Sequence, residues 1–119
     1  MDNVAATALA AILGIADPGA ATSTQVLIAL SGDAERKTVA YECEGVTPFK
    51  VEYINAGQNF LAVVPVDGFN VAFVNVLAAS GARYVSGQYE WWTKGSDATF
   101  IDVTDESASV TCLERVETP

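Results

Sequence analysis

The sequence predicts a mainly β protein, a small antiparallel β-barrel of eight strands preceded by an N-terminal helix. From Thr38 onward, short apolar runs recur about every ten residues, which is typical of barrels and sandwiches. Turn-forming pairs rich in Gly, Asn and Asp separate these runs. Residues 2–16, in contrast, are rich in Ala and carry no charge after Asp2. We therefore divide the chain into an N-terminal helix and linker extension, 1–37, and a barrel domain, 38–119.

Composition and charge limit the classes of function. The chain has 119 residues, half of them apolar, so it is long enough for one core and is not a disordered polymer. It carries 15 acidic and 6 basic residues, a net charge of −9, and no His. Such a charge repels nucleic acid and anionic membranes and attracts a basic protein partner at long range. Simple solubility is the alternative explanation of the charge.

The first residues predict a helix over 3–15. Asp2 and Asn3 are good N-cap residues, and the Asp-Pro-Gly of 17–19 is a helix stop. The segment is too short to span a bilayer and lacks the basic leader of a secretory signal. We expect a mature exported chain, without a membrane anchor, in which Met1 replaces the signal. A helix with no charged face packs on the barrel or on a second copy, so we predict a homodimer.

The next residues connect this helix to the barrel. Residues 20–24 are small and polar and indicate a linker. The apolar run 25–30 is ambiguous between strand and helix, and we interpret it as an extra strand outside the barrel. Residues 31–37 are polar and indicate a loop.

Eight strands are then expected, at 38–43, 49–54, 59–65, 70–77, 82–86, 88–93, 97–103 and 107–113. Antiparallel strands joined by short turns can close into a barrel and so remove sheet edges. Side chains fill the interior of so small a barrel, and this disfavours a hydrophobic carrier. The apolar residues expected there are Phe49, Val51, Tyr53, Val71, Phe73 and Phe100.

Cys43 and Cys112, the two cysteines, lie near the two ends of the β-region. Each is in phase with apolar neighbours at a spacing of two, so both can face one interior and form a disulfide. A bridge closing so long a loop stabilises by roughly 4 kcal/mol in the chain-entropy model. It also indicates an oxidising compartment, the periplasm or the outside. The alternative is a pair of buried thiols in a cytosolic protein.

The residues needed for most enzymatic chemistry are missing. Without His there is no Ser-His-Asp triad and no His-ligated metal, and no Gly-rich phosphate loop is present. Carboxylates are numerous, but their spacing singles out no glycosidase pair. We therefore predict no enzymatic activity, no metal and no cofactor.

The most informative stretch is 80–95. Two apolar runs separated by a Ser-Gly pair predict a β-hairpin, whose closed geometry brings the loop at Ser80 close to Lys94. Along the second strand Trp91 and Trp92 must face opposite sides of the sheet. The sequence leaves open which of the two is buried.

This stretch resembles the bacterial inhibitors of c-type lysozyme, whose signatures are S-G-x-x-Y followed by Y-x-x-K-G. Residues 80–84 match the first signature in full. Residues 91–95 match the second with Trp91 in place of Tyr, which keeps the aromatic plate and loses the phenol hydroxyl. The resemblance extends from about Tyr41 to Cys112.

The resemblance implies that Ser80 and Lys94 enter the active-site cleft of a basic c-type lysozyme without any chemistry of their own. Each also has a structural reading, Ser80 as a common turn residue and Lys94 as an exposed strand end. The full set of lysozyme-binding residues that we expect is Ser80, Gly81, Arg83, Tyr84, Trp92, Thr93, Lys94 and Gly95.

We therefore expect a periplasmic inhibitor that protects peptidoglycan from a host lysozyme. The family also has a lipoprotein branch anchored through an N-terminal Cys, and no Cys precedes Cys43 here, which favours the soluble branch. One alternative is an extracytoplasmic glycan-binding barrel with Trp91 or Trp92 as a stacking plate. Another is an assembly role for the N-terminal helix and the extra strand.

Overall fold

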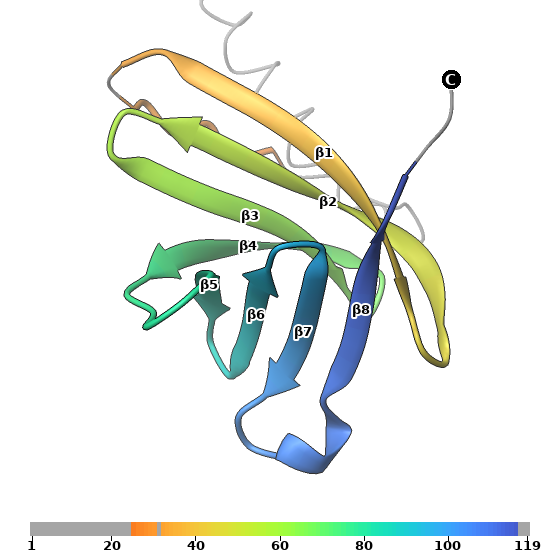
Figure 1. Ribbon diagram of the computed structural model, residues 1–119. Coiled ribbons are helices and arrows are strands. Elements are labelled where there is room, and N and C mark those ends of the chain that lie inside the picture. The colour runs from red at the N-terminus through yellow and green to blue at the C-terminus, as the bar shows by residue number, and fades with distance from the viewer. Residues whose placement is uncertain (1–24, 31, 117–119) are drawn as a thin grey trace, which may run out of the picture.

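The computed structural model describes residues 25–30 and 32–116, and it is a closed eight-stranded barrel (Figure 1). Each strand pairs antiparallel with the next, and the last strand pairs with the first. The predicted mainly β, eight-stranded antiparallel barrel is therefore confirmed. The strands are β1 (Ala34–Cys43), β2 (Val46–Ala56), β3 (Asn59–Val66), β4 (Phe69–Val76), β5 (Ala82–Ser86), β6 (Tyr89–Lys94), β7 (Asp97–Asp102) and β8 (Val110–Arg115).

Alternation along the strands places the large apolar side chains inside the barrel. Trp91, Phe73, Val51 and Val64 have almost no exposed surface. Every residue predicted for the interior lies in or against this core, and Trp91, not Trp92, is the buried tryptophan. Trp91 is on the inner side because Trp91 pairs with Phe100 and Tyr84 across the two neighbouring strands.

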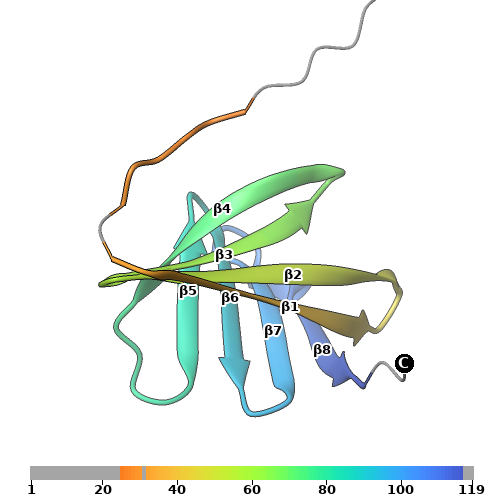
Figure 2. The same ribbon diagram turned by 90° about the horizontal axis from the view of Figure 1, so that it is seen from above.

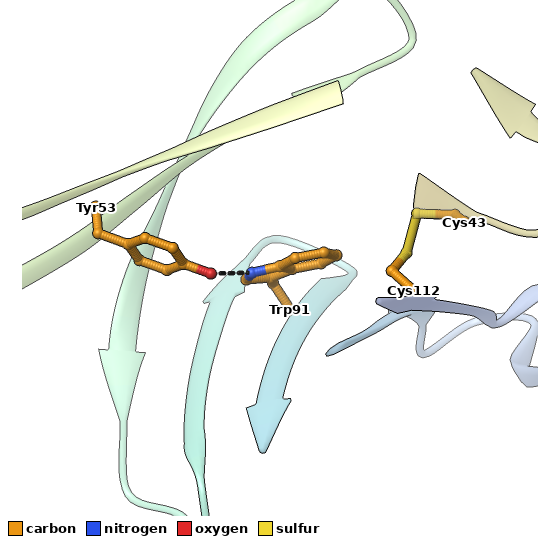
Figure 3. The surroundings of a disulfide bond; sticks show 4 residues. All are labelled: Cys43, Tyr53, Trp91 and Cys112. Atoms are coloured by element: carbon orange, nitrogen blue, oxygen red, sulfur yellow. Dashed lines mark hydrogen bonds between the residues drawn. A yellow bond between two sulfur atoms is a disulfide. The ribbon is translucent and has the colours of Figure 1, made fainter. Parts of the chain in front are cut away.

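Three side chains of the described residues form a polar group inside the core. The indole Nε1 of Trp91 donates a 2.8 Å hydrogen bond to the hydroxyl of Tyr53 (Figure 3). The hydroxyls of Tyr53 and Tyr41 share a second hydrogen bond of 2.7 Å. Burial is the largest cause of the raised pKa of Tyr53. Since these polar atoms satisfy one another, the barrel can enclose them without the cost of unpaired donors.

The predicted disulfide is confirmed: Cys43 on β1 is bonded to Cys112 on β8 (Figure 3). The two residues are directly opposite in the β1–β8 ladder, which is the pairing that closes the barrel. They are 69 positions apart in the sequence. The alternative of two buried thiols is therefore wrong.

The prediction of an extra strand at 25–30 is wrong. These residues have no regular structure and are all exposed, Leu27 to 97%. Apolar composition favours a strand only where a neighbouring strand is paired with it, and residues 25–30 pair with no strand of the barrel. The helix expected at 3–15 lies outside the described residues, and the homodimer that depends on it stays a prediction.

Most strand boundaries differ from the expectation by a few residues, and the differences at β1 and β8 are among the largest. The predicted loop 31–37 ends earlier, since β1 already begins at Ala34, and its polar residues pair with the far half of β2. These residues form an exposed arm at the start of β1, beside β2 (Figure 2). Within this arm Arg36 forms a 2.6 Å ion pair with Glu52. At the other end of the chain, Glu106–Ala108 forms a 3₁₀ turn, so β8 begins at Val110.

Candidate functional site

The β5–β6 hairpin brings the two predicted key residues to one end of the barrel. Ala82 lies opposite Thr93 and Arg83 lies opposite Trp92. The loop that precedes β5 therefore lies beside the end of β6, where Lys94 is the last strand residue. Both Ser80 and Lys94 are exposed.

Gly81 makes this close approach possible. Its φ is +69°, in the left-handed region that side chains rarely adopt. A Cβ atom on Gly81 would stand 2.7 Å from Cγ of Lys94 and closer still to the carbonyl oxygen of Thr93. Gly81 thus packs directly on the Thr93 backbone and the Lys94 side chain, which no residue with a side chain could do unchanged.

Trp92 lies on the outer side of the barrel, between the loop and Lys94. Its Nε1 donates a 2.8 Å hydrogen bond to the carbonyl oxygen of Ser80. The ammonium Nζ of Lys94 lies 4.9 Å from the centroid of the Trp92 ring, within cation–π range. The guanidinium of Arg83 lies 5.8 Å from the same centroid.

Arg83 is held by its own neighbours. Its guanidinium forms an ion pair and hydrogen bonds with Oε1 of Glu90, across the β5–β6 hairpin. Its Nη1 donates a 3.4 Å hydrogen bond to the carbonyl oxygen of Leu77, at the start of the loop. Arg83 therefore borders the site while its charge is engaged within the hairpin.

The remaining predicted residues divide between the site and the core. Tyr84 faces the barrel interior, where it is only 8% exposed and its ring centroid lies 5.7 Å from that of Tyr53. It is not among the exposed groups. Thr93 is half-buried, and its Oγ1 donates a 3.4 Å hydrogen bond to the carbonyl oxygen of Ala82. Gly95 follows Lys94 in an exposed turn with a φ of +60°.

Two features of this region were not predicted from the sequence. Leu77, at the start of the same loop, is 93% exposed. A groove of about 260 Å³ also runs along the outer side of β6, β7 and β8, next to Lys94. Alternation along 97–101 was the available signal, because it places the odd-numbered residues on one side of the sheet. The groove is lined by Trp92, Lys94, Asp97, Thr99, Ile101 and Thr111.

A second cavity, of about 250 Å³, is lined mainly by apolar side chains and the disulfide. It offers one carboxylate, from Asp67, and so no convergent set of polar groups for a catalytic site. Over residues 25–30 and 32–116, no group of three acidic or Cys side chains is placed to hold a metal ion. Within the same residues, no helix has the length and apolar character needed to cross a membrane.

Comparisons with known proteins agree on one family. Residues 41–109 match the family model described as membrane-bound lysozyme inhibitor of c-type lysozyme. A protein of that name from Pseudomonas aeruginosa is 45% identical over an alignment of 111 residues, and this alignment covers 86% of this chain and 85% of the relative. A protein of the same name from Cupriavidus necator is 38% identical over 81 residues, which is 68% of this chain and 65% of the relative. These relatives are named as inhibitors, not as enzymes.

A solved structure gives the same result in three dimensions. It is the crystal structure of Pseudomonas aeruginosa MliC in complex with hen egg white lysozyme. The similarity has a TM-score of 0.67 at 41% sequence identity and covers 81% of this chain and 99% of that chain.

Proposed function

The chain belongs to the family of membrane-bound lysozyme inhibitors of c-type lysozyme, and from this premise we propose that it blocks c-type lysozyme by inserting Ser80 and Lys94 into the active-site cleft. The observation that carries the proposal is the geometry of one barrel end. There an exposed hydroxyl and an exposed ammonium are brought together by the packing of Gly81 on Lys94.

The chemistry of a lysozyme cleft matches these two groups. A retaining glycosidase holds two carboxyl groups about 5 Å apart, one protonated and one ionised. A hydroxyl can donate to the carboxylate and accept from the protonated acid. An ammonium supplies the positive charge that the ionised carboxylate otherwise directs at the oxocarbenium-like transition state.

The wider surface supports the same partner. A net charge of −9 favours association with a basic protein, and the attraction acts before contact. Arg83 and Glu90 neutralise each other beside the site, and Lys94 offers an exposed cation there. The expected contact surface comprises Ser80, Gly81, Thr93, Lys94 and Gly95, with Trp92 and Arg83 at its border.

The biological role follows from the target. An inhibitor of host lysozyme protects peptidoglycan, and its place of action is outside the cytoplasm. The Cys43–Cys112 disulfide fits such an oxidising compartment, and we propose the periplasm.

Glycan binding is the second candidate function. The observation that favours it is the groove beside Trp92, in which an aromatic ring lies next to Asp97, Thr99 and Thr111. Sugars stack on such rings and bond to such polar groups. Lys94, however, already lies over the Trp92 ring.

A turbidity assay of bacterial cell-wall lysis separates the two functions. The inhibitor proposal predicts that one equivalent of the protein abolishes lysis by a c-type lysozyme. Binding to peptidoglycan fragments without any effect on the enzyme would instead establish the glycan-binding function.

A further inference from the structure

The indole of Trp92 contacts both groups of the proposed inhibitory surface. Its Nε1–H is bonded to the carbonyl oxygen of Ser80, and its ring lies 4.9 Å from Nζ of Lys94. Building on the proposed function, we infer that Trp92 is a positioning residue. It fixes the Ser80 hydroxyl and the Lys94 ammonium relative to one another before lysozyme binds.

Trp92 holds one end of the loop, and Arg83 holds the other. Arg83 Nη1 donates to the carbonyl oxygen of Leu77, and Glu90 fixes the guanidinium in turn. Asn75 adds a 3.2 Å hydrogen bond from Nδ2 to the carbonyl oxygen of Arg83. Two side chains on the outer side of the β5–β6 hairpin therefore hold this loop. Arg83 holds it at Leu77, and Trp92 holds it at Ser80. Without the indole N–H, the Ser80 end loses its side-chain anchor.

Lys94 gains the most from such an arrangement. A free lysine side chain loses rotamer entropy when it is immobilised at an interface, and this loss weakens binding. Because the Trp92 ring already holds the Lys94 ammonium in the free protein, less rotamer entropy is lost when lysozyme binds. Trp92 can act in this way because it is half-exposed on the outer side, whereas Trp91 fills the core.

The variant that tests the inference is Trp92→Phe in the full chain. It keeps an aromatic ring and removes the N–H donor. We expect only a small decrease in thermal stability, because one exposed hydrogen bond and no core contact is lost. We expect the amide order parameters of Ser80 and Gly81 in the free protein to fall from about 0.85 towards 0.6 or below. The affinity for lysozyme should weaken about five- to tenfold, as the loss of one hydrogen bond predicts.

Combination with Ser80→Ala distinguishes positioning from an independent contact. Ser80→Ala removes the hydroxyl and keeps the carbonyl that Trp92 binds. If Trp92 acts by placing that hydroxyl, Trp92→Phe costs less affinity in the Ser80→Ala background than in the parent. Purely additive losses, with unchanged order parameters, would overturn the inference.

The control is Phe69→Leu, at the exposed start of β4. It changes an exposed aromatic residue outside the loop, and it should alter neither the order parameters nor the affinity for lysozyme. If Trp92→Phe does not fold, the inference is tested instead by hydrogen exchange of the Trp92 indole N–H in the parent. Exchange as fast as in a free indole contradicts the inference, and slowed exchange supports it.

The two proposals fail separately. The order parameters and the indole exchange are measured on the free protein, so they test positioning even if the parent does not inhibit lysozyme. If the parent inhibits lysozyme and the loop stays rigid in Trp92→Phe, the proposed function holds. The positioning role of Trp92 is then excluded.

Discussion

Gly81 lies directly against the carbonyl oxygen of Thr93, with no room for a side chain between the two backbones. This contact joins the loop before β5 to the end of β6. It thereby sets the spacing between Ser80 and Lys94, on which the proposed function depends.

Gly81→Ala should therefore damage the site more than any loss of stability explains. The new Cβ meets the Thr93 carbonyl and Cγ of Lys94, so the loop must move away from β6. We expect the affinity for lysozyme to fall at least tenfold, measured by titration calorimetry. The matched control is Gly87→Ala, in the turn between β5 and β6 and outside the expected contact surface. Gly87 has a similar positive φ of +56°, and an added Cβ would meet no non-neighbouring atom within 4 Å. It bears a comparable backbone cost, about 1 kcal/mol, and should keep most of the affinity. Equal losses in the two variants would show that the contact with Thr93 is unimportant.

The polar group in the core predicts the effect of Tyr53→Phe on stability. The change leaves the buried Nε1–H of Trp91 without its acceptor and removes the bond shared with Tyr41. We expect a loss of about 1–3 kcal/mol in the free energy of unfolding, measured by urea denaturation. Tyr89→Phe is the control, since the Tyr89 ring stacks on Phe100 and that stacking is kept. It should stay within about 0.5 kcal/mol of the parent. If the free energy of unfolding were unchanged in Tyr53→Phe, this polar group would not contribute to stability.

Stability should also fall at alkaline pH. Burial raises the pKa of Tyr41, Tyr53 and Tyr84 above the ordinary value near 10. Above about pH 10 the unfolded chain loses these protons while the folded chain keeps them. The folded state then binds more protons than the unfolded state, so its stability decreases as the pH rises. Below about pH 9 the three tyrosines should not make the free energy of unfolding depend on pH.

Urea unfolding between pH 8 and pH 11 measures this dependence. Tyr53→Phe should reduce the slope above pH 10, because it removes one of the titrating groups. A slope that is the same in the parent and the variant would exclude Tyr53 as a source of the effect.

The disulfide should supply a large share of the stability. Cys43 and Cys112 close a loop of 69 positions, for which the chain-entropy model gives roughly 4 kcal/mol. Domains of this kind have only about 5–15 kcal/mol in total. Reduction with a phosphine should therefore lower the denaturation midpoint sharply. A double variant, Cys43→Ala with Cys112→Ala, should not respond to the reductant. No change on reduction of the parent would contradict the entropic contribution.

The strand pattern explains why most of the barrel could be predicted from the sequence. Alternation from Thr38 onward gave the inner residues, and the phase of Cys43 and Cys112 gave their pairing. The apolar run 25–30 was misinterpreted, because its composition suits a strand but the run pairs with no strand of the barrel. Local composition does not contain that information.

The site was less accessible to sequence reasoning. The motifs drew attention to Ser80 and Lys94, and the hairpin rule predicted that they are close. Trp91 and Trp92, however, have the same side chain and adjacent positions, so only the packed barrel decides which is buried. The hydrogen bond from Trp92 to Ser80 links side chain to backbone across the hairpin, and no spacing rule encodes it.

The most direct test of the proposed function is the affinity of the double variant Ser80→Ala with Lys94→Ala for a c-type lysozyme. Its matched control is Ser107→Ala with Lys37→Ala, which removes the same two groups and the same charge elsewhere. Ser107 lies in the 3₁₀ turn at the opposite end of β7 from Lys94, and Lys37 lies on β1 (Figure 1). We predict that the first variant loses at least a hundredfold in affinity and no longer stops cell-wall lysis, while the control inhibits as the parent does. If both double variants bind lysozyme as tightly as the parent, Ser80 and Lys94 are not the inhibitory residues.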